Sequence, residues 1–187
     1  MIVIATLQTE FATLCFSAAA ADPDDLRRRL VIRTVDYAGT LPAGMTVDAT
    51  ACVDVGITAG GPIHDFAFSA RLLDMPEQGS PESGEWLDAQ SFVRGSGVLM
   101  LGTEDGDSLA NRLSWFNLNY STNYPIAYLS DGFEIGFRYV PPDKPLDFHF
   151  ILAYNASDRR DSSEWFAVDA AQDAVRNAST GRHLRVR

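Results

Sequence analysis

The most informative absences in this sequence are those of cysteine, histidine and long hydrophobic runs. The two cysteines, Cys15 and Cys52, are too few for a disulfide framework and lack the spacing of zinc ligands. The three histidines are scattered and form no metal-binding motif, so we predict neither a metal nor a cofactor. No apolar run approaches the roughly 20 residues that cross a bilayer, so we expect no membrane association.

Sequence motifs for common catalytic chemistry are also missing. The tripeptide Gly95-Ser96-Gly97 is not a GxSxG nucleophile motif, and there is no SxxK, P-loop or GxGxxG pattern. Cys52 lies in a strand-like segment beside Asp48 and Asp54, whose charges disfavour a thiolate. These absences favour a protein that is not an enzyme.

Positive charge is scarce and unevenly placed. The net charge is −10, and Lys144 is the single lysine. An acidic body argues against nucleic-acid binding, because phosphate contacts need clustered positive charge. Residues 177–187 form a basic C-terminal arm that can bind nucleic acid or dock on the acidic surface of a neighbouring copy. The arginines of this partner-contact region are Arg176, Arg182, Arg185 and Arg187.

The N-terminal residues 1–16 are apolar but lack the basic segment of a secretory signal, because the first basic residue is Arg27. We therefore expect a first strand or two here, and a cytoplasmic or virion location.

Alternating hydrophobicity is the strongest structural signal. Residues 45–55 place Met45, Val47, Val53 and Val55 on one face and acids, threonines and Cys52 on the other, which predicts a strand with one wet face. The same period occurs at 133–139 and 146–154, and the proline-rich segment between them predicts a hairpin-like connection. Weaker strands are predicted at 2–9, 11–16, 30–37, 63–73, 91–101, 115–120 and 165–168.

Helical signals are short. Residues 22–29 combine an N-cap aspartate, a proline in the first turn and arginines in the last turn. Further short helices are predicted at 107–114 and 169–178. Many strands without crossover helices indicate antiparallel pairing. The fold class is therefore mainly β, a β-sandwich resembling a jelly roll, with a closed barrel as the alternative. Residues 1–176 are expected to form one domain with an acidic loop at 74–85.

His64 and Asp65 are adjacent, which suggests a catalytic pair. Neighbours in a regular strand point to opposite sides of the sheet, so the two side chains cannot hydrogen-bond. His64 falls on the face of Phe66 and Phe68, where it is a core or rim residue or lines a pocket. His149 and Asp147 share a face, and we interpret them as a solvated pair.

The segment 115–128 interleaves aromatic residues with asparagine, serine and threonine. Such residues can stack on a sugar, anchor a protein interface, or fill the core and form turns. The candidate ligand or interface residues are Trp115, Asn117, Asn119, Tyr120, Asn123, Tyr124 and His64.

Three functions follow as hypotheses. The first is a non-enzymatic subunit of a homo-oligomeric assembly, such as a virion or tail-like particle. The second is an acidic immunity protein or inhibitor whose acids at 74–85 and 103–108 bind a basic toxin. The third is an enzyme or a barrel that binds a small ligand or glycan in a pocket around His64.

Overall fold

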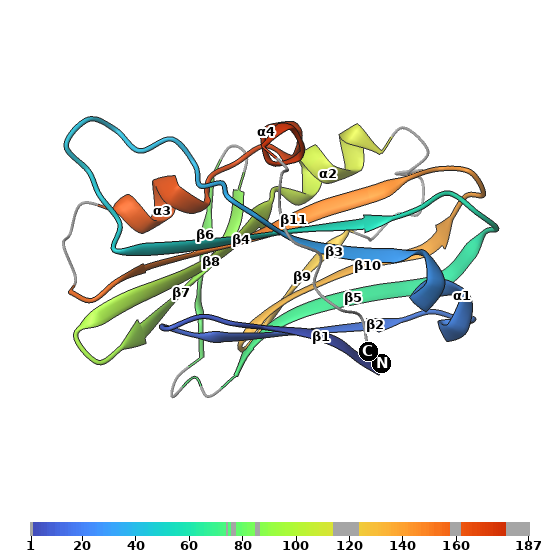
Figure 1. The fold of residues 1–187 in the computed structure, drawn as a ribbon, viewed down its shortest axis with the longest axis horizontal. Helices are drawn as coiled ribbons and strands as arrows, with labels where there is room; N and C mark the ends of the chain where they lie inside the picture. The colour runs from blue at the N-terminus through green and yellow to red at the C-terminus, as the bar shows by residue number, and fades with distance from the viewer. Residues whose placement is uncertain are drawn as a thin grey trace.

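Two antiparallel sheets make up most of the computed structural model, which describes residues 2–73, 75, 78–84, 87–113, 124–157 and 162–178 (Figure 1). In spatial order, the first sheet contains β1 (Ile2–Gln8), β2 (Thr13–Ala19), β5 (Ile63–Leu73), β10 (Gly132–Val140) and β9 (Ile126–Leu129). The second sheet contains β3 (Leu30–Val35), β4 (Ala49–Ile57), β11 (Leu146–Asn155), β8 (Gly97–Glu104), β7 (Leu87–Arg94) and β6 (Ser80–Ser83). The helices are α1 (Pro23–Arg29), α2 (Gly106–Arg112), α3 (Ser163–Val168) and α4 (Gln172–Asn177).

The predicted antiparallel β-sandwich is confirmed. Strands β4 and β11 pair in the second sheet while β5 and β10, which adjoin them in sequence, pair in the first. The chain therefore passes between the sheets as a wound antiparallel ribbon, which is the jelly-roll-like arrangement. The alternative of a closed barrel is wrong, because each sheet ends in two edge strands.

The main core lies between the sheets. The rings of Phe16 and Phe68 on the first sheet contact those of Phe148 and Phe150 on the second, with centroids 5.2 to 6.2 Å apart. A second hydrophobic cluster lies on the outer face of the second sheet, where Ile151 packs with Val168 and Val175 of the short helices. No helix in the described part of the chain has the length and hydropathy to cross a membrane.

Helix α1 forms as its sequence predicts. Asp22 is the N-cap, and its side chain accepts a hydrogen bond of 3.0 Å from the backbone N–H of Asp25. Pro23 occupies the first turn and Arg29 the last, where its charge complements the helix dipole.

The predicted strand 45–55 is displaced and its polar face is not wet. The strand begins at Ala49, and both Cys52 and Asp54 are only 2% exposed. The reason is that the short C-terminal helices cover this face of the second sheet, as Figure 1 shows for α3 and α4.

The predicted hairpin between residues 133–139 and 146–154 is also wrong. Both strands exist, but β10 pairs with β5 and β9 in the first sheet, whereas β11 pairs with β4 and β8 in the second. The proline-rich connection therefore passes from one sheet to the other.

Three further segments differ from prediction. Residues 91–101 do not form one strand but the end of β7, a turn where Gly95 has φ of +66°, and the start of β8. Residues 165–168 belong to helix α3, which packs Ala167 and Val168 against the outer face of the second sheet and does not add a strand to it. The acidic loop 74–85 contains the edge strand β6. The predicted strand 115–120 lies outside the described residues.

Candidate functional site

A row of four polar residues crosses the outer face of the second sheet. Arg33 on β3 pairs with Asp54 on β4, and Asp54 pairs with His149 on β11. Because Phe150 pairs with Thr103, the next residue of β8, Glu104, continues this polar row beside His149. Except for Arg33, these side chains are at most 5% exposed.

Helices α2 and α4 supply the partners of the polar row. The amide of Gln172 donates to Asp54 at 3.0 Å, and its carbonyl oxygen lies 2.7 Å from Nδ1 of His149. Arg112 donates to both carboxylate oxygens of Glu104 and to Asp147 at 2.7 Å. Arg176 forms an ion pair with Asp147. The chain therefore satisfies the carboxylates of this face with its own arginines and glutamine.

His149 is neutral in this setting. Burial lowers its pKa to about 4, and the charge of Arg112 acts in the same direction. Since the Gln172 amide donates to Asp54, its carbonyl oxygen faces Nδ1, which must carry the proton. Nε2 has no hydrogen-bond partner among the described residues. The prediction of a solvated His149–Asp147 pair is wrong, although the two share a face.

Asp147 is held in its charged form. Burial alone would raise its pKa, but hydrogen bonds and charges from Arg176 and Arg112 lower it below the ordinary value. The three arginines Arg33, Arg112 and Arg176 thus balance the three carboxylates of Asp54, Glu104 and Asp147. Such a balanced network stabilises one packing arrangement and leaves little charge for a ligand.

The cavity beside this network is small. It has a volume of about 260 Å³ between α2 and α4, and Arg112, Gln172 and Asn111 are among its lining residues. Each of the three guanidinium nitrogens of Arg112 already donates to Glu104 or Asp147. Among the described residues, no group of three or more histidine, cysteine, aspartate or glutamate side chains is placed to hold a metal ion.

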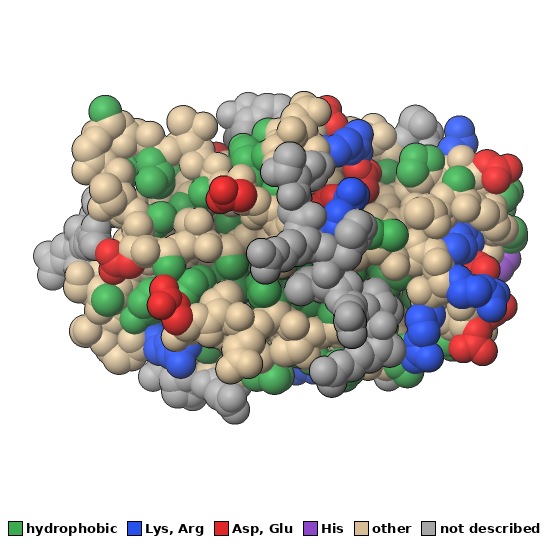
Figure 2. Space-filling model, in the orientation of Figure 1, with side chains coloured by type: hydrophobic (Ala, Val, Ile, Leu, Met, Phe, Trp, Pro, Cys, Tyr) green, Lys and Arg blue, Asp and Glu red, His purple; other side chains and the backbone are tan. Residues whose placement is uncertain are grey.

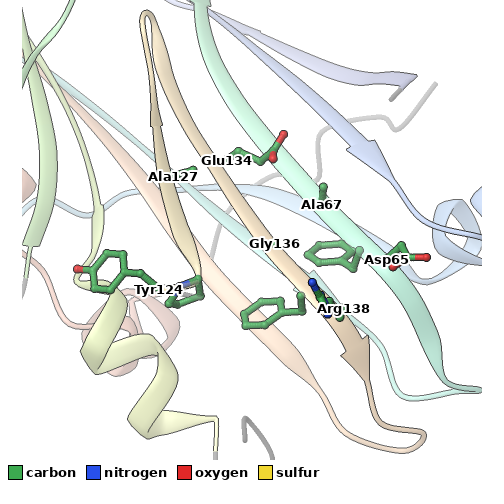
Figure 3. A pocket seen from close by; sticks show the side chains of 10 residues that line it. Asp65, Ala67, Tyr124, Ala127, Glu134, Gly136 and Arg138 are labelled. Carbon is green, nitrogen blue, oxygen red and sulfur yellow. The ribbon is translucent and has the colours of Figure 1, made fainter. Parts of the chain in front are cut away.

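A groove of about 280 Å³ lies on the outer face of the first sheet. Its floor is formed by Ala67, Ala127 and Gly136, and charged side chains such as Asp65 and Arg138 lie at one end (Figure 3). Figure 3 shows the ring of Tyr124 extending away from that charged end. The groove is open and offers few converging polar groups.

His64 is not where the alternation predicts. Asp65 has φ of +52°, and this left-handed conformation breaks the alternation, so that Ile63 and Phe66 both face the core. His64 is therefore exposed and packs against Tyr139, with ring centroids 5.2 Å apart. It does not line the groove. His64 and Asp65 form no hydrogen bond with each other in the described part of the chain, as predicted.

Of the candidate residues named within the segment 115–128, Tyr124 is the one that the structure describes. Its hydroxyl lies 2.7 Å from Asp88 and 2.9 Å from Asp105, and accepts the backbone N–H of Gly106 at 3.0 Å. Burial and the hydrogen bond to Asp88 raise its pKa. The hydroxyl is thus occupied within the chain. The candidates outside the described residues are Trp115, Asn117, Asn119, Tyr120, Asn123, Arg182, Arg185 and Arg187.

Tyr124 belongs to a line of cross-sheet hydrogen bonds, which we call the polar seam. Asp88 also accepts from the hydroxyl of Tyr128 at 2.5 Å, and the amide of Gln90 donates to the backbone oxygen of Leu129 at 2.7 Å. These bonds join β7 of the second sheet to β9 of the first. The polar seam therefore closes this lateral side of the sandwich.

The opposite lateral side ends in β1 and β3, and no comparable line of hydrogen bonds links these two strands among the described residues. In the described part of the chain, no hydrogen bond joins β1 to the second sheet, and β2 is its one strand partner. The seven residues of β1 carry no charge, and Val3 is 60% exposed. Figure 2 shows hydrophobic side chains at the surface between β3 and β1. We call the unpaired side of β1 the β1 edge.

The other edge strands are shorter or carry a device that hinders pairing. Strand β6 has four residues including Pro81 and Glu82, β9 has four residues, and β3 contains Arg33. Short length, proline, charge and β-bulges are features by which edge strands avoid pairing with other chains, and of these β1 has a bulge. Sequence reasoning found β1 as a strand but missed its edge position. No signal within residues 2–8 identifies this position, because it depends on the order of the strands in the sheet.

Comparison with known proteins gave no match to a family model, to a curated protein or to a solved structure.

Proposed function

We propose that this chain is a non-enzymatic subunit that associates with further copies of itself through the β1 edge. The observation that carries the proposal is the contrast between the two lateral sides of the sandwich. One side is closed by the polar seam, whereas the other ends in a seven-residue strand without charge.

The physical basis is the chemistry of an unpaired strand. An edge strand presents backbone N–H and C=O groups that another strand can pair with, and apolar side chains at the same edge gain from burial. Because the whole chain carries a net charge of −10, two copies repel each other overall. An uncharged edge is where this repulsion opposes contact least.

The polar row also supports the proposal, because its charged groups are used within the chain. Its carboxylates and arginines are paired within the chain, and His149 is buried and neutral. Cys52 is a buried free thiol whose pKa is raised to about 12 by burial and by Asp54. These groups fit a role in stabilising the fold, which leaves association as the better-supported activity.

A particle larger than a dimer, such as a virion or tail-like particle, needs a second contact. Our expectation for it is the basic arm 177–187, of which the structure describes residues 177 and 178. Arg176, next to this arm, pairs with Asp147 within the chain.

The proposal is tested by measuring the native mass by light scattering across a range of protein concentrations. We expect a concentration-dependent mass above that of one chain. The variant Val3→Glu places a charge at the β1 edge and should shift the mass toward the monomer. Val93→Glu is the matched control, because Val93 is 57% exposed and lies on β7 of the second sheet, which does not pair with β1, and it should leave the mass unchanged. A monomer at every concentration would contradict the proposal.

A further inference from the structure

The side chains of β1 do not alternate regularly, because the strand contains a bulge. Val3 pairs with Ser17 and Ala5 with Phe16, so Ile4 is an extra residue on β1. Both Ile4 and Ala5 face the core, with exposed fractions of 1% and 5%. Two neighbouring inward side chains are expected at a bulge, where the alternation is interrupted.

The resulting pattern of side-chain directions is symmetric about the Ile4–Ala5 peptide bond. Ile2 and Leu7 both pack against the core, one on each side of the bulge. Val3 and Thr6 are both exposed on the outer face. Read from either end, residues 2–7 follow the same order: inward, outward, inward, inward, outward, inward.

This symmetry matches an antiparallel copy of the same strand. In an antiparallel pair, residues directly opposite each other point to the same face of the sheet. A two-fold axis at the Ile4–Ala5 bond places Val3 opposite Thr6 of the second copy, both outward. It also places Ile2 opposite Leu7 of the second copy, both inward. A partner strand with regular alternation would match one half of β1 and present the wrong face to the other half.

We propose that the partner of the β1 edge is β1 of a second copy, paired antiparallel about the Ile4–Ala5 bond. This inference rests on the proposed function and specifies its interface. The first sheets of two copies then join into one sheet of ten strands, five from each copy. The contact is a closed two-fold interface, in which the same surface of each copy is used. The bulge, which hinders pairing with other strands, here selects the identical strand.

The predicted register can be tested by mixing two cysteine variants. Val3→Cys and Thr6→Cys are made separately in a Cys15→Ser background, because Cys15 lies opposite Thr6 within the chain. Directly opposite residues have Cβ atoms about 4.5–5.5 Å apart, close to the reach of a disulfide. Two copies of position 3, or two of position 6, are about 10 Å apart along the strands and cannot form one.

After mild oxidation, we expect a covalent dimer of twice the chain mass in the mixture and no dimer above background from either variant alone. The sample is analysed on a non-reducing gel, and both variants are first checked for native mass. If both associate but the mixture forms no more dimer than either variant alone, the register is wrong while self-association stands. If neither the variants nor the natural chain associates, the proposed function fails as well.

Discussion

The two lateral sides of this sandwich differ in how the two sheets are linked there. At the β9 side, Tyr124, Tyr128 and Gln90 close the gap between the sheets with hydrogen bonds, and the edge strands have only four residues. At the β1 side, a strand of seven uncharged residues has no polar link to the second sheet among the described residues. The described residues therefore link the two sheets by side-chain hydrogen bonds at the β9 side, and no such link joins β1 to the second sheet.

The largest expected effect comes from breaking the closed side. Asp88 is 3% exposed and accepts hydrogen bonds from Tyr124, Tyr128 and the backbone N–H of Gly106. Asp88→Ala leaves these donors without their acceptor, and we expect it to lower the free energy of unfolding by about 3–4 kcal/mol. Urea unfolding monitored by circular dichroism measures this change.

The matched control for this prediction is Asp107→Ala. Asp107 is an exposed acid in the first turn of α2, so its loss should change the free energy of unfolding by about 0.5 kcal/mol or less. Equal unfolding midpoints for the two variants would mean that the polar seam does not hold this side together.

The pH dependence of stability reports on the polar face of the second sheet, because His149 titrates there whereas β1 has no ionisable side chain. The pKa of His149 is about 4 in the folded chain and 6.5 when unperturbed. Between these values the unfolded chain binds one more proton than the folded chain, so stability falls as the pH is lowered. We expect His149 to contribute a loss of about 3 kcal/mol between pH 6.5 and pH 4.

The variant His149→Gln tests the assignment of this pH dependence. Glutamine can donate to Gln172 but does not titrate, so the slope of stability against pH should decrease by one proton in this window. The stabilising ionisation of Asp147, whose pKa is lowered, is lost only at lower pH, below the ordinary value of 3.8. An unchanged slope would show that another group is responsible.

The sequence predicted the parts of the fold that depend on local pattern. The alternation at 133–139 and 146–154 identified two real strands, and Asp22 with Pro23 identified the start of α1. It did not reveal that the two strands belong to different sheets, because alternation specifies which faces are apolar and not which strand lies beside which.

The candidate site could be predicted only in small part, because it depends on distant contacts. Asp54 and His149 were assigned to a wet face, yet Gln172, 118 residues after Asp54, covers them. For His64, one left-handed residue at Asp65 reversed the face that the period assigned. The β1 edge depends on the final strand order, which no local pattern of residues 2–8 contains.

The smallest expected effect is that of salt on association, and its sign separates self-pairing from binding to a basic partner. Two copies with a net charge of −10 repel each other, and about 0.1 M salt screens charges beyond about 10 Å. Salt should therefore strengthen pairing through the uncharged β1 edge by roughly a few fold, measured by analytical ultracentrifugation. In Val3→Glu, whose two added charges lie about 10 Å apart on either side of the two-fold axis, residual association should rise more steeply with salt than in Val93→Glu. Association that weakens with salt would instead indicate attraction between acidic and basic surfaces, as expected for an acidic inhibitor of a basic toxin.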